Sequence, residues 1–411
     1  MTLGHHTSVI IGDMSANPDA SGDQAFVDLV TDEAPTTPHS LTDAPLKVRV
    51  AIVGVLTLIT ALFWGFGAWA LFPDAAHWSF ANFGRLTFLL AGVAMIVLAI
   101  RGNSAGEHDA AARGAHFLLG LGWILFVWSV IGLLGRSVLS GLSLHPEAAA
   151  RLTSLGVAAV VTLLAIFGYA AARRVPALRH TTVPIKNLSR PLTVAVLTDT
   201  HFDAWTTPQW ASRVVERVNS TSPDIVVHAG DLADGSVAQR SAQVQWLADV
   251  QAGTRAYIAG NHEYYSDAPA WMKYMDQLGW SVLINQHLVH EQTLVVAGLD
   301  DPTGTAMAGR GPSVDQALAS APSLPILLLA HQPHQVKDAL ERVDLQISGH
   351  THGGQIWPFH YLVKLREPVV QGLATVSPRT RLYVSRGSGF WGPPFRVFAP
   401  SEISVLHLVP A

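Results

Sequence analysis

The chain has no cysteine among its 411 residues, so disulfides, thiolate metal ligands and a cysteine nucleophile are all excluded. Charge is also scarce. Asp, Glu, Lys and Arg make up 14% of the residues, whereas soluble proteins carry about a quarter. This deficit indicates that part of the chain lies in lipid. The net charge of −4 offers no electrostatic basis for a nucleic-acid partner, and none is expected.

Lys and Arg are missing from the first 46 positions, which carry seven acidic side chains and scattered Pro, Ser and Thr. Low hydrophobicity with charge of one sign is typical of disordered segments. We therefore expect a disordered acidic tail at residues 1–46.

Four apolar stretches follow the tail, at residues 50–72, 86–100, 117–135 and 152–172. A bilayer-spanning helix needs about 20 apolar residues, which the first, third and fourth stretches supply. The second has only 15 unbroken apolar residues and reaches full length only if Arg85 lies at the membrane interface. The alternative for any one stretch is a buried helix of a soluble domain. Because all four follow one another at hairpin spacing, we predict a four-helix transmembrane region at 47–172 and a multi-pass protein of the cell membrane.

The distribution of Lys and Arg predicts the orientation of these helices. With four spans, the side that holds both chain ends carries nine basic residues and the other side three. Positive charge favours the cytoplasmic side, so the tail and the C-terminal region are predicted to face the cytoplasm. If the second stretch did not span, the two ends would lie on opposite sides. The nine are Lys47, Arg49, Arg101, Arg113, Arg173, Arg174, Arg179, Lys186 and Arg190, and the three are Arg85, Arg136 and Arg151.

Residues 173–191 read as a basic, proline-broken linker, and the pattern changes after them. From residue 192, short apolar runs alternate with helical patterns at 208–220, 238–250 and 268–278. This alternation predicts a layered α/β domain at 192–411. The expected strands are 193–198, 224–229, 254–259, 293–298, 325–330, 345–349, 381–385 and 403–409.

Polar residues stand at the C-terminal ends of five of these strands, where layered α/β domains usually build their sites. The groups are Asp199-x-His201, Gly230-Asp231-x-x-Asp234, Gly260-Asn261-His262-Glu263, His331 and Gly349-His350-x-His352.

Carboxylates, a carboxamide and imidazoles are the oxygen and nitrogen ligands that pairs of divalent ions take. The Asp-x-His and His-x-His spacings place both side chains on one side of an extended strand end. The alternative is a set of unrelated turns and core histidines, which explains any single group better than all five in order. The sequence therefore predicts a dinuclear metal centre.

The five groups resemble the motifs of the calcineurin-like metallophosphoesterases, over about residues 192–410. Residues 349–358 (GHTHGGQIWP) and 386–402 (RGSGFWGPPFRVFAPSE) look like the membrane-associated YkuE-type branch. The layout of several spans before this domain is similar to transmembrane proteins with a metallophosphoesterase domain. The resemblance implies a β-sandwich flanked by helices.

The same resemblance implies roles for individual residues. Asp199, His201 and His352 would hold one metal ion, and Asp231 would bridge two ions. Asn261, His331 and His350 would hold the second ion. His262 would face the substrate, and an imidazole with a pKa near neutrality suits proton donation to a leaving oxygen.

The reaction implied is hydrolysis of a phosphomonoester or phosphodiester by a water that the two ions activate. Manganese is the leading candidate for the ions, with iron and zinc as alternatives, because the ligand set accepts all three. The substrate is a phosphoester that is either lipid-linked, close to the membrane, or soluble. A rival from another class is a non-catalytic membrane sensor or scaffold. A complete ligand set together with His262 favours the enzyme.

Overall fold

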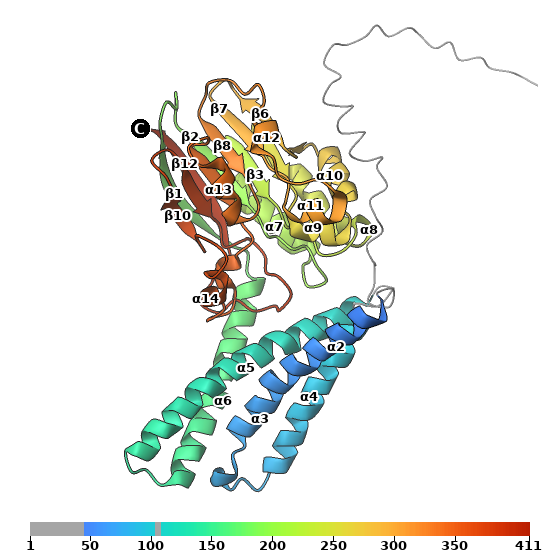
Figure 1. Cartoon of the computed structure of the whole chain (residues 1–411), viewed down its shortest axis with the longest axis vertical. Coiled ribbons are helices and arrows are strands. Elements are labelled where there is room, and N and C mark those ends of the chain that lie inside the picture. Colours follow the sequence, from blue (N-terminus) through green and yellow to red (C-terminus); the bar gives the residue numbers. More distant parts are fainter. Residues whose placement is uncertain (1–44, 103–107) are drawn as a thin grey trace, which may run out of the picture. The chain divides into compact units, whose positions relative to one another are not determined.

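The computed structural model describes residues 45–102 and 108–411, so residues 1–44 of the predicted acidic tail lie outside the described part. Four helical segments in the described part are long and apolar enough to cross a membrane, including the weak second stretch (Figure 1). The first consists of α2 (Leu46–Thr60), the π-helical turn η1 (Ala61–Gly65), α3 (Phe66–Leu71) and η2 (Asp74–Ala76). The others are α4 (Ala81–Gly102), α5 (Asp109–Gly141) and α6 (Pro146–Arg173).

Arg85, the charged residue of the second stretch, lies near the start of α4. Its guanidinium donates to the backbone oxygen of Phe72, 3.1 Å from Nε, and pairs with Asp74. Both partners lie at the end of the preceding segment, so the charge is neutralised at the turn between two helices. This explains how a 22-residue apolar helix accommodates an arginine.

The C-terminal domain contains two six-stranded mixed sheets. One has the order β1-β12-β2-β3-β4-β5 and the other β10-β11-β9-β8-β7-β6. Apolar side chains from both, such as Val196 and Ile225 from the first and Val296 and Ile347 from the second, form one buried core. The domain is therefore a β-sandwich. The strands are β1 (Ala177–Ile185), β2 (Leu192–Leu197), β3 (Ile225–Ala229), β4 (Thr254–Ile258), β5 (Ser281–Val282), β6 (Gln286–His290), β7 (Leu294–Gly298), β8 (Ile326–Leu329), β9 (Leu345–Ser348), β10 (Gly372–Thr375), β11 (Arg381–Val384) and β12 (Glu402–Pro410).

All eight predicted strands are present, and the structure adds β1, β5, β6 and β10. Strand β1 lies inside the segment predicted as a linker and pairs in parallel with β12, so the sheet begins at Ala177. Only Val183 and Ile185 of its nine residues are buried, and Pro184 between them interrupts the apolar pattern. A strand at a sheet edge needs no continuous apolar run, which is why hydrophobicity did not reveal it.

Helices flank the sandwich, and the three predicted helical segments are confirmed as α7, α8 with η3, and α10. Helix α7 shows why: Thr207 caps its N-terminus, and Ala211, Val214 and Val218 lie on one buried face. The helices are α7 (Pro208–Asn219), α8 (Val237–Val244), η3 (Gln245–Asp249), α9 (Asn261–Ser266), α10 (Ala268–Gln277), α11 (Thr303–Ala308), α12 (Val314–Ala317), η4 (Pro333–Gln335), α13 (Val336–Ala339), η5 (His352–Gly354) and α14 (His360–Val363).

The apolar helices and the domain share a hydrophobic cluster. Ile356, Phe395 and Val397 of the domain belong to the same buried cluster as Ile124 of α5 and Val161 of α6. The contact is close. A Cβ added at Gly120 would lie 2.5 Å from the Phe395 ring, and one at Gly168 would lie 2.9 Å from Val397. The segment containing residues 393–397 therefore packs directly against two glycines of the apolar helices.

Candidate metal centre

The predicted site residues meet at one edge of the sandwich, where five strands end. Asp199 and His201 follow β2, Asp231 follows β3, and Asn261 follows β4. His331 comes after β8, and His350 and His352 come after β9. Because β2, β3 and β4 are parallel neighbours, as are β8 and β9, their carboxyl ends bring these side chains together.

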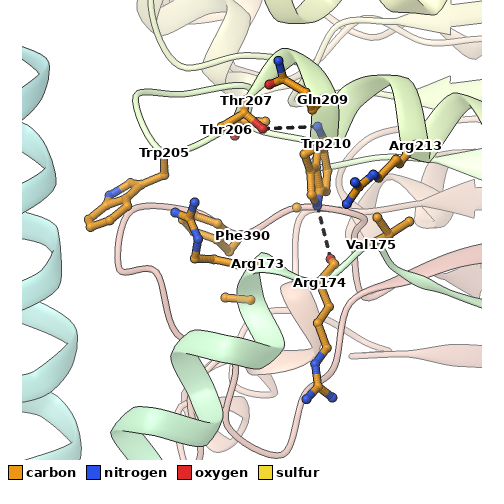
Figure 2. Close-up of a pocket in the computed structure, with 12 residues that line it drawn as sticks. Arg173, Arg174, Val175, Trp205, Thr206, Thr207, Gln209, Trp210, Arg213 and Phe390 are labelled. Atoms are coloured by element: carbon orange, nitrogen blue, oxygen red, sulfur yellow. Dashed lines mark hydrogen bonds between the residues drawn. The ribbon is translucent and has the colours of Figure 1, made fainter.

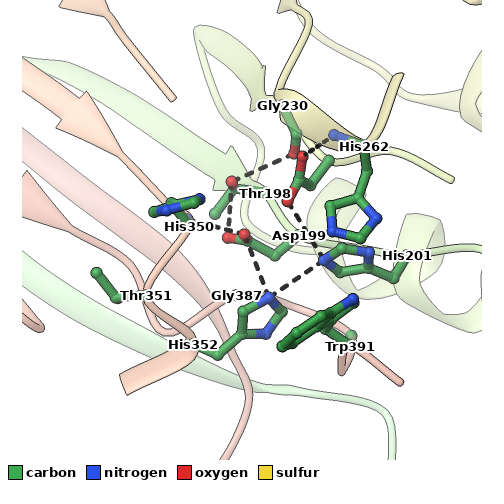
Figure 3. Close-up of polar contacts among 12 residues, drawn as sticks. Thr198, Asp199, His201, Gly230, His262, His350, Thr351, His352, Gly387 and Trp391 are labelled. Atoms are coloured by element: carbon green, nitrogen blue, oxygen red, sulfur yellow. Dashed lines mark hydrogen bonds and ion pairs between the residues drawn. The ribbon is translucent and has the colours of Figure 1, made fainter. Parts of the chain in front are cut away.

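One group of possible ligand atoms comprises a carboxylate oxygen of Asp199 and imidazole nitrogens of His201 and His352, all within 4.8 Å of one another (Figure 3). The Nε2 atoms of the two histidines are 3.1 Å apart, and His352 Nε2 lies 3.5 Å from Asp199 Oδ1. The three residues are buried.

A second group comprises Asp231, His331 and His350, again with ligand atoms within 4.8 Å. Asp231 Oδ2 lies 3.2 Å from His331 Nε2 and 3.5 Å from His201 Nε2 of the first group. Asn261 is adjacent, with its Oδ1 3.0 Å from His350 Nδ1. The Asp231 carboxylate therefore faces both groups.

These spacings suit metal ligation. Two ligand atoms at right angles on one ion, each at about 2.1 Å, lie about 3.0 Å apart, close to the separations observed. The hydrogen bonding of His331 tests whether its ring is suited to bind a metal ion. Its Nδ1 donates to the backbone oxygen of Ala229 at 2.8 Å, while its buried Nε2 makes no hydrogen bond among the described residues. A ring whose tautomer is fixed by a backbone carbonyl, with its free nitrogen facing a carboxylate, fits a metal ligand.

The backbone at this site is unusual. Asp199, His201, Asp231, His350 and His352 all have positive φ, between 39° and 69°. Residues other than glycine rarely adopt this conformation, which costs of order 1 kcal/mol or more at each position. Such strain persists where the surrounding structure enforces it, and here it coincides with five of the seven predicted ligands. Position 230, next to Asp231, requires glycine, because a Cβ there would lie 2.6 Å from His331 Nδ1.

Glu263 joins the loop after β3 to the loop after β4. Its side chain is completely buried and accepts from the backbone N–H groups of Gly260, Asp231 and Leu232. Burial raises the pKa of Glu263 to about 7, with the Asp231 charge adding to the effect. The residue serves the loop geometry and is not aimed at the ligand groups.

His262 is positioned by a carboxylate that the sequence did not single out as its partner. Its Nδ1 donates to Asp234 Oδ1 at 2.6 Å, and His201 Nδ1 donates to the same oxygen at 3.2 Å. Burial lowers the pKa of His262, but the charges of Asp231 and Asp234 outweigh this and raise it to about 9. Asp234 therefore orients two imidazoles and keeps His262 protonated near neutral pH.

Arg396 is the second residue that sequence reasoning did not place. It is fully buried and donates to the backbone oxygens of Gly389, His352 and Ala399 and to His352 Nδ1. Since a guanidinium only donates, His352 carries its proton on Nε2 in this structure and donates to His201 Nε2. A neutral imidazole that held a metal ion through Nε2 would carry its proton on Nδ1, so the hydrogen bond from Arg396 to Nδ1 would open on metal binding. Arg396 thus fixes the turn that presents His352 and does not point to substrate.

Trp391 lies at the open side of the site, where its ring is 5.9 Å from that of His262. Half of the Trp391 surface is exposed. Both residues lie in the segment 386–402, but local spacing does not show their contacts, because Arg396 touches His352, 44 residues earlier, and Trp391 touches the more distant His262. The motif Gly230-Asp231-x-x-Asp234 did contain a signal for Asp234.

The fold and the site agree with the known proteins to which the chain is similar. Residues 192–354 match the calcineurin-like phosphoesterase family. A protein of Danio rerio named "Transmembrane protein with metallophosphoesterase domain" is 32% identical over 306 residues, which cover 70% of each chain. The chain therefore belongs to the calcineurin-like metallophosphoesterases.

Two bacterial relatives are similar over the C-terminal part. An uncharacterized metallophosphoesterase of Helicobacter pylori is 38% identical over 240 residues, 57% of this chain and 64% of that protein. The chain thus spans less than two thirds of that relative's length. The uncharacterized metallophosphoesterase YkuE of Bacillus subtilis is 30% identical over 229 residues, 52% of this chain and 78% of its own.

Proposed function

We propose that this protein is a membrane-anchored phosphoesterase with a two-metal centre. In this proposal Asp199, His201 and His352 hold one ion, and Asp231 contacts both ions. Asn261, His331 and His350 complete the second position. The observation that carries the proposal is the place of Asp231 Oδ2, 3.5 Å from a nitrogen of the first group and 3.2 Å from one of the second.

When bound, two divalent ions activate water and neutralise charge on a phosphoryl group. The protein's own contribution is proton delivery and orientation. His262 is held by Asp234 in its protonated form, and an imidazolium beside the ligand groups can donate to the oxygen that leaves phosphorus. We propose manganese as the ion, with iron and zinc as alternatives, because oxygen and nitrogen ligands without sulfur accept all three.

We further propose that the substrate is a phosphoester in or near the membrane. The segment around α14 exposes Tyr361, Leu362 and Leu365, the last at 83% of its surface. The same segment contacts an apolar helix, since the Phe359 ring packs on Trp123 of α5 at 5.9 Å. Exposed apolar side chains beside a helix that can cross a membrane suit a lipid surface. The excess of Lys and Arg flanking the helices on this side supports a cytoplasmic catalytic domain.

Hydrolysis by the full-length chain in detergent micelles tests the proposed activity. The chain is stripped of metal, supplied with Mn²⁺, and assayed with bis-p-nitrophenyl phosphate and p-nitrophenyl phosphate. We expect metal-dependent release that Asp231→Asn reduces by about 10³-fold or more, since the variant weakens both metal positions. His262→Gln is expected to keep two metal ions per chain and lose about 10²–10⁴-fold in turnover.

The matched control is Asp276→Asn, the same chemical change at an exposed position of α10. Its activity and metal content should equal those of the parent chain. Two bound ions without turnover on either compound would overturn the esterase proposal for these substrates and favour the sensor. Full turnover in His262→Gln would remove this residue from the reaction.

A further inference from the structure

A cavity lies where α6 ends and the C-terminal domain begins (Figure 2). It has a volume of about 420 Å³. Its walls come from three places in the chain: residues 172–175 at the end of α6, residues 205–213 around the start of α7, and the loop at Gly389 and Phe390. No residue of the candidate metal groups lines it.

The polar lining of this cavity is positively charged. Arg173, Arg174 and Arg213 line it, and no Asp or Glu does. Among the described residues, none of the three guanidinium groups forms an ion pair. The Arg173 guanidinium instead lies over the rings of Tyr169 and Trp205, at 5.4 and 5.7 Å from their centroids. Arginines in the lining without any carboxylate favour an anionic ligand.

Three aromatic rings also line the cavity, those of Trp205, Trp210 and Phe390 (Figure 2). Trp210 Nε1 donates to the backbone oxygen of Arg174 at 3.2 Å. Trp205 Nε1 is buried and has no acceptor among the described residues. Because solvent does not reach this nitrogen, the Trp205 ring contributes apolar surface to the lining and not a donor.

The position of the cavity decides what kind of anion it suits. Arg173 is the last residue of α6, a 28-residue apolar helix long enough to span a membrane. Arginines at such a helix end lie at the level of lipid headgroups. We propose that this cavity binds the phosphate of an anionic membrane lipid, with its acyl chains along α6. The shared chemistry is a phosphate, which a free phosphate ion could also supply.

The cavity is separate from the metal centre, but the loop at residues 389–391 contacts both. Phe390 lines the cavity, and its neighbour Trp391 contacts the ring of His262. Gly389 N donates to the backbone oxygen of Asp199 at 2.9 Å. Lipid binding at the cavity does not depend on the proposed phosphoesterase activity, so each can fail without the other.

The test is lipid binding by the full-length chain in detergent micelles, measured by native mass spectrometry. Phosphatidylglycerol and phosphatidylcholine with identical acyl chains are titrated separately. We expect phosphatidylglycerol to bind at least about tenfold more tightly, because both lipids carry the phosphate but the choline cation of phosphatidylcholine cancels its net charge and is repelled by the arginines. Arg213→Gln should weaken phosphatidylglycerol binding by about tenfold, and the double variant Arg173→Gln with Arg174→Gln by more. Asp231→Asn should bind this lipid as the parent does.

The matched control is Arg217→Gln, which removes the same charge one turn further along α7 at an exposed position that does not line the cavity. Equal binding of the two lipids, or an equal loss in Arg217→Gln and Arg213→Gln, would overturn the proposal. Loss of binding in Asp231→Asn would assign the lipid to the metal centre and overturn it as well. Competition with inorganic phosphate is measured last. Displacement of phosphatidylglycerol by phosphate at equal concentration would make free phosphate the ligand and overturn the lipid assignment. Thermal unfolding of each variant without lipid confirms that it is folded.

Discussion

In α6 the side chain of Leu163 is 67% exposed, whereas in strand β12 the side chain of Leu406 is completely buried. The polar residues are arranged in the opposite way, because the domain encloses Asp199 and Glu263 without exposure to water. The helical region thus presents apolar side chains to its surroundings, and the domain keeps charged groups inside. Lipid can solvate the first arrangement, and hydrogen bonds and the proposed metal ions stabilise the second. The same residue type should therefore respond differently to mutation in the two regions.

The largest effect on stability is expected for Arg396→Met, where the two regions meet. The change removes five N–H donors and leaves the buried carbonyls of Gly389 and Ala399 without a partner among the described residues. We expect a loss of about 3–5 kcal/mol in the free energy of unfolding, together with weaker metal binding at the position of His352. Thermal unfolding and metal analysis of the full-length chain measure both. Arg217→Met is the control at an exposed site, and an equal effect of the two would refute a special role for Arg396.

Replacing one buried and one exposed leucine tests whether the two regions respond differently to mutation. Leu406→Ser should lower the free energy of unfolding by about 3 kcal/mol, because it opens a cavity in the core and buries a hydroxyl. That corresponds to roughly 6–12 °C in the melting temperature. Leu163→Ser should change the unfolding free energy by under about 1 kcal/mol, since few protein atoms surround that side chain. Equal losses would show that Leu163 is buried by a partner and not by lipid.

The charged interior of the domain can be tested by pH. Because the pKa of His262 is raised, its protonated form persists to high pH, and activity should be lost as pH rises through that pKa. Asp234→Asn removes one of the charges that raises the pKa, so the alkaline limb of kcat/KM should move to lower pH by about one unit. Metal content should stay at two ions per chain. An unmoved limb would mean that His262 does not donate the proton.

The smallest effect is expected at an ion pair between the two regions. Arg240 of α8 donates two hydrogen bonds to Asp109 at the start of α5, at 2.8 and 2.7 Å. Asp109 is partly exposed, so we expect Asp109→Asn to cost only about 1 kcal/mol. A double-mutant cycle with Arg240→Gln isolates the pair from the bond that Arg240 also makes to Asp234. A coupling energy of zero would show that the pair does not hold the regions together.

The sequence predicted the features that have a local signal. Apolar runs located the four long helices and eight strands, including those that end at the candidate ligands. Strands β1 and β10 were not predicted, because an edge strand has few buried side chains and β10 has none that is fully buried. Within the site, the strand-end motifs identified the residues that the fold brings together. The contacts of Arg396 with His352 and of Asp234 with two histidines depend on tertiary packing, which no local spacing encodes.

Gly168 has a consequence for how this protein can change over evolutionary time. Its backbone oxygen accepts from the backbone N–H of Arg396 at 2.9 Å, and the Arg396 side chain holds the turn at His352. A larger residue at position 168 would push against Val397, next in the chain to Arg396. The helices and the metallophosphoesterase domain are therefore not exchangeable modules. A chimera that joins this domain to the helices of a distant relative would need to inherit the small residues at 120 and 168 along with it.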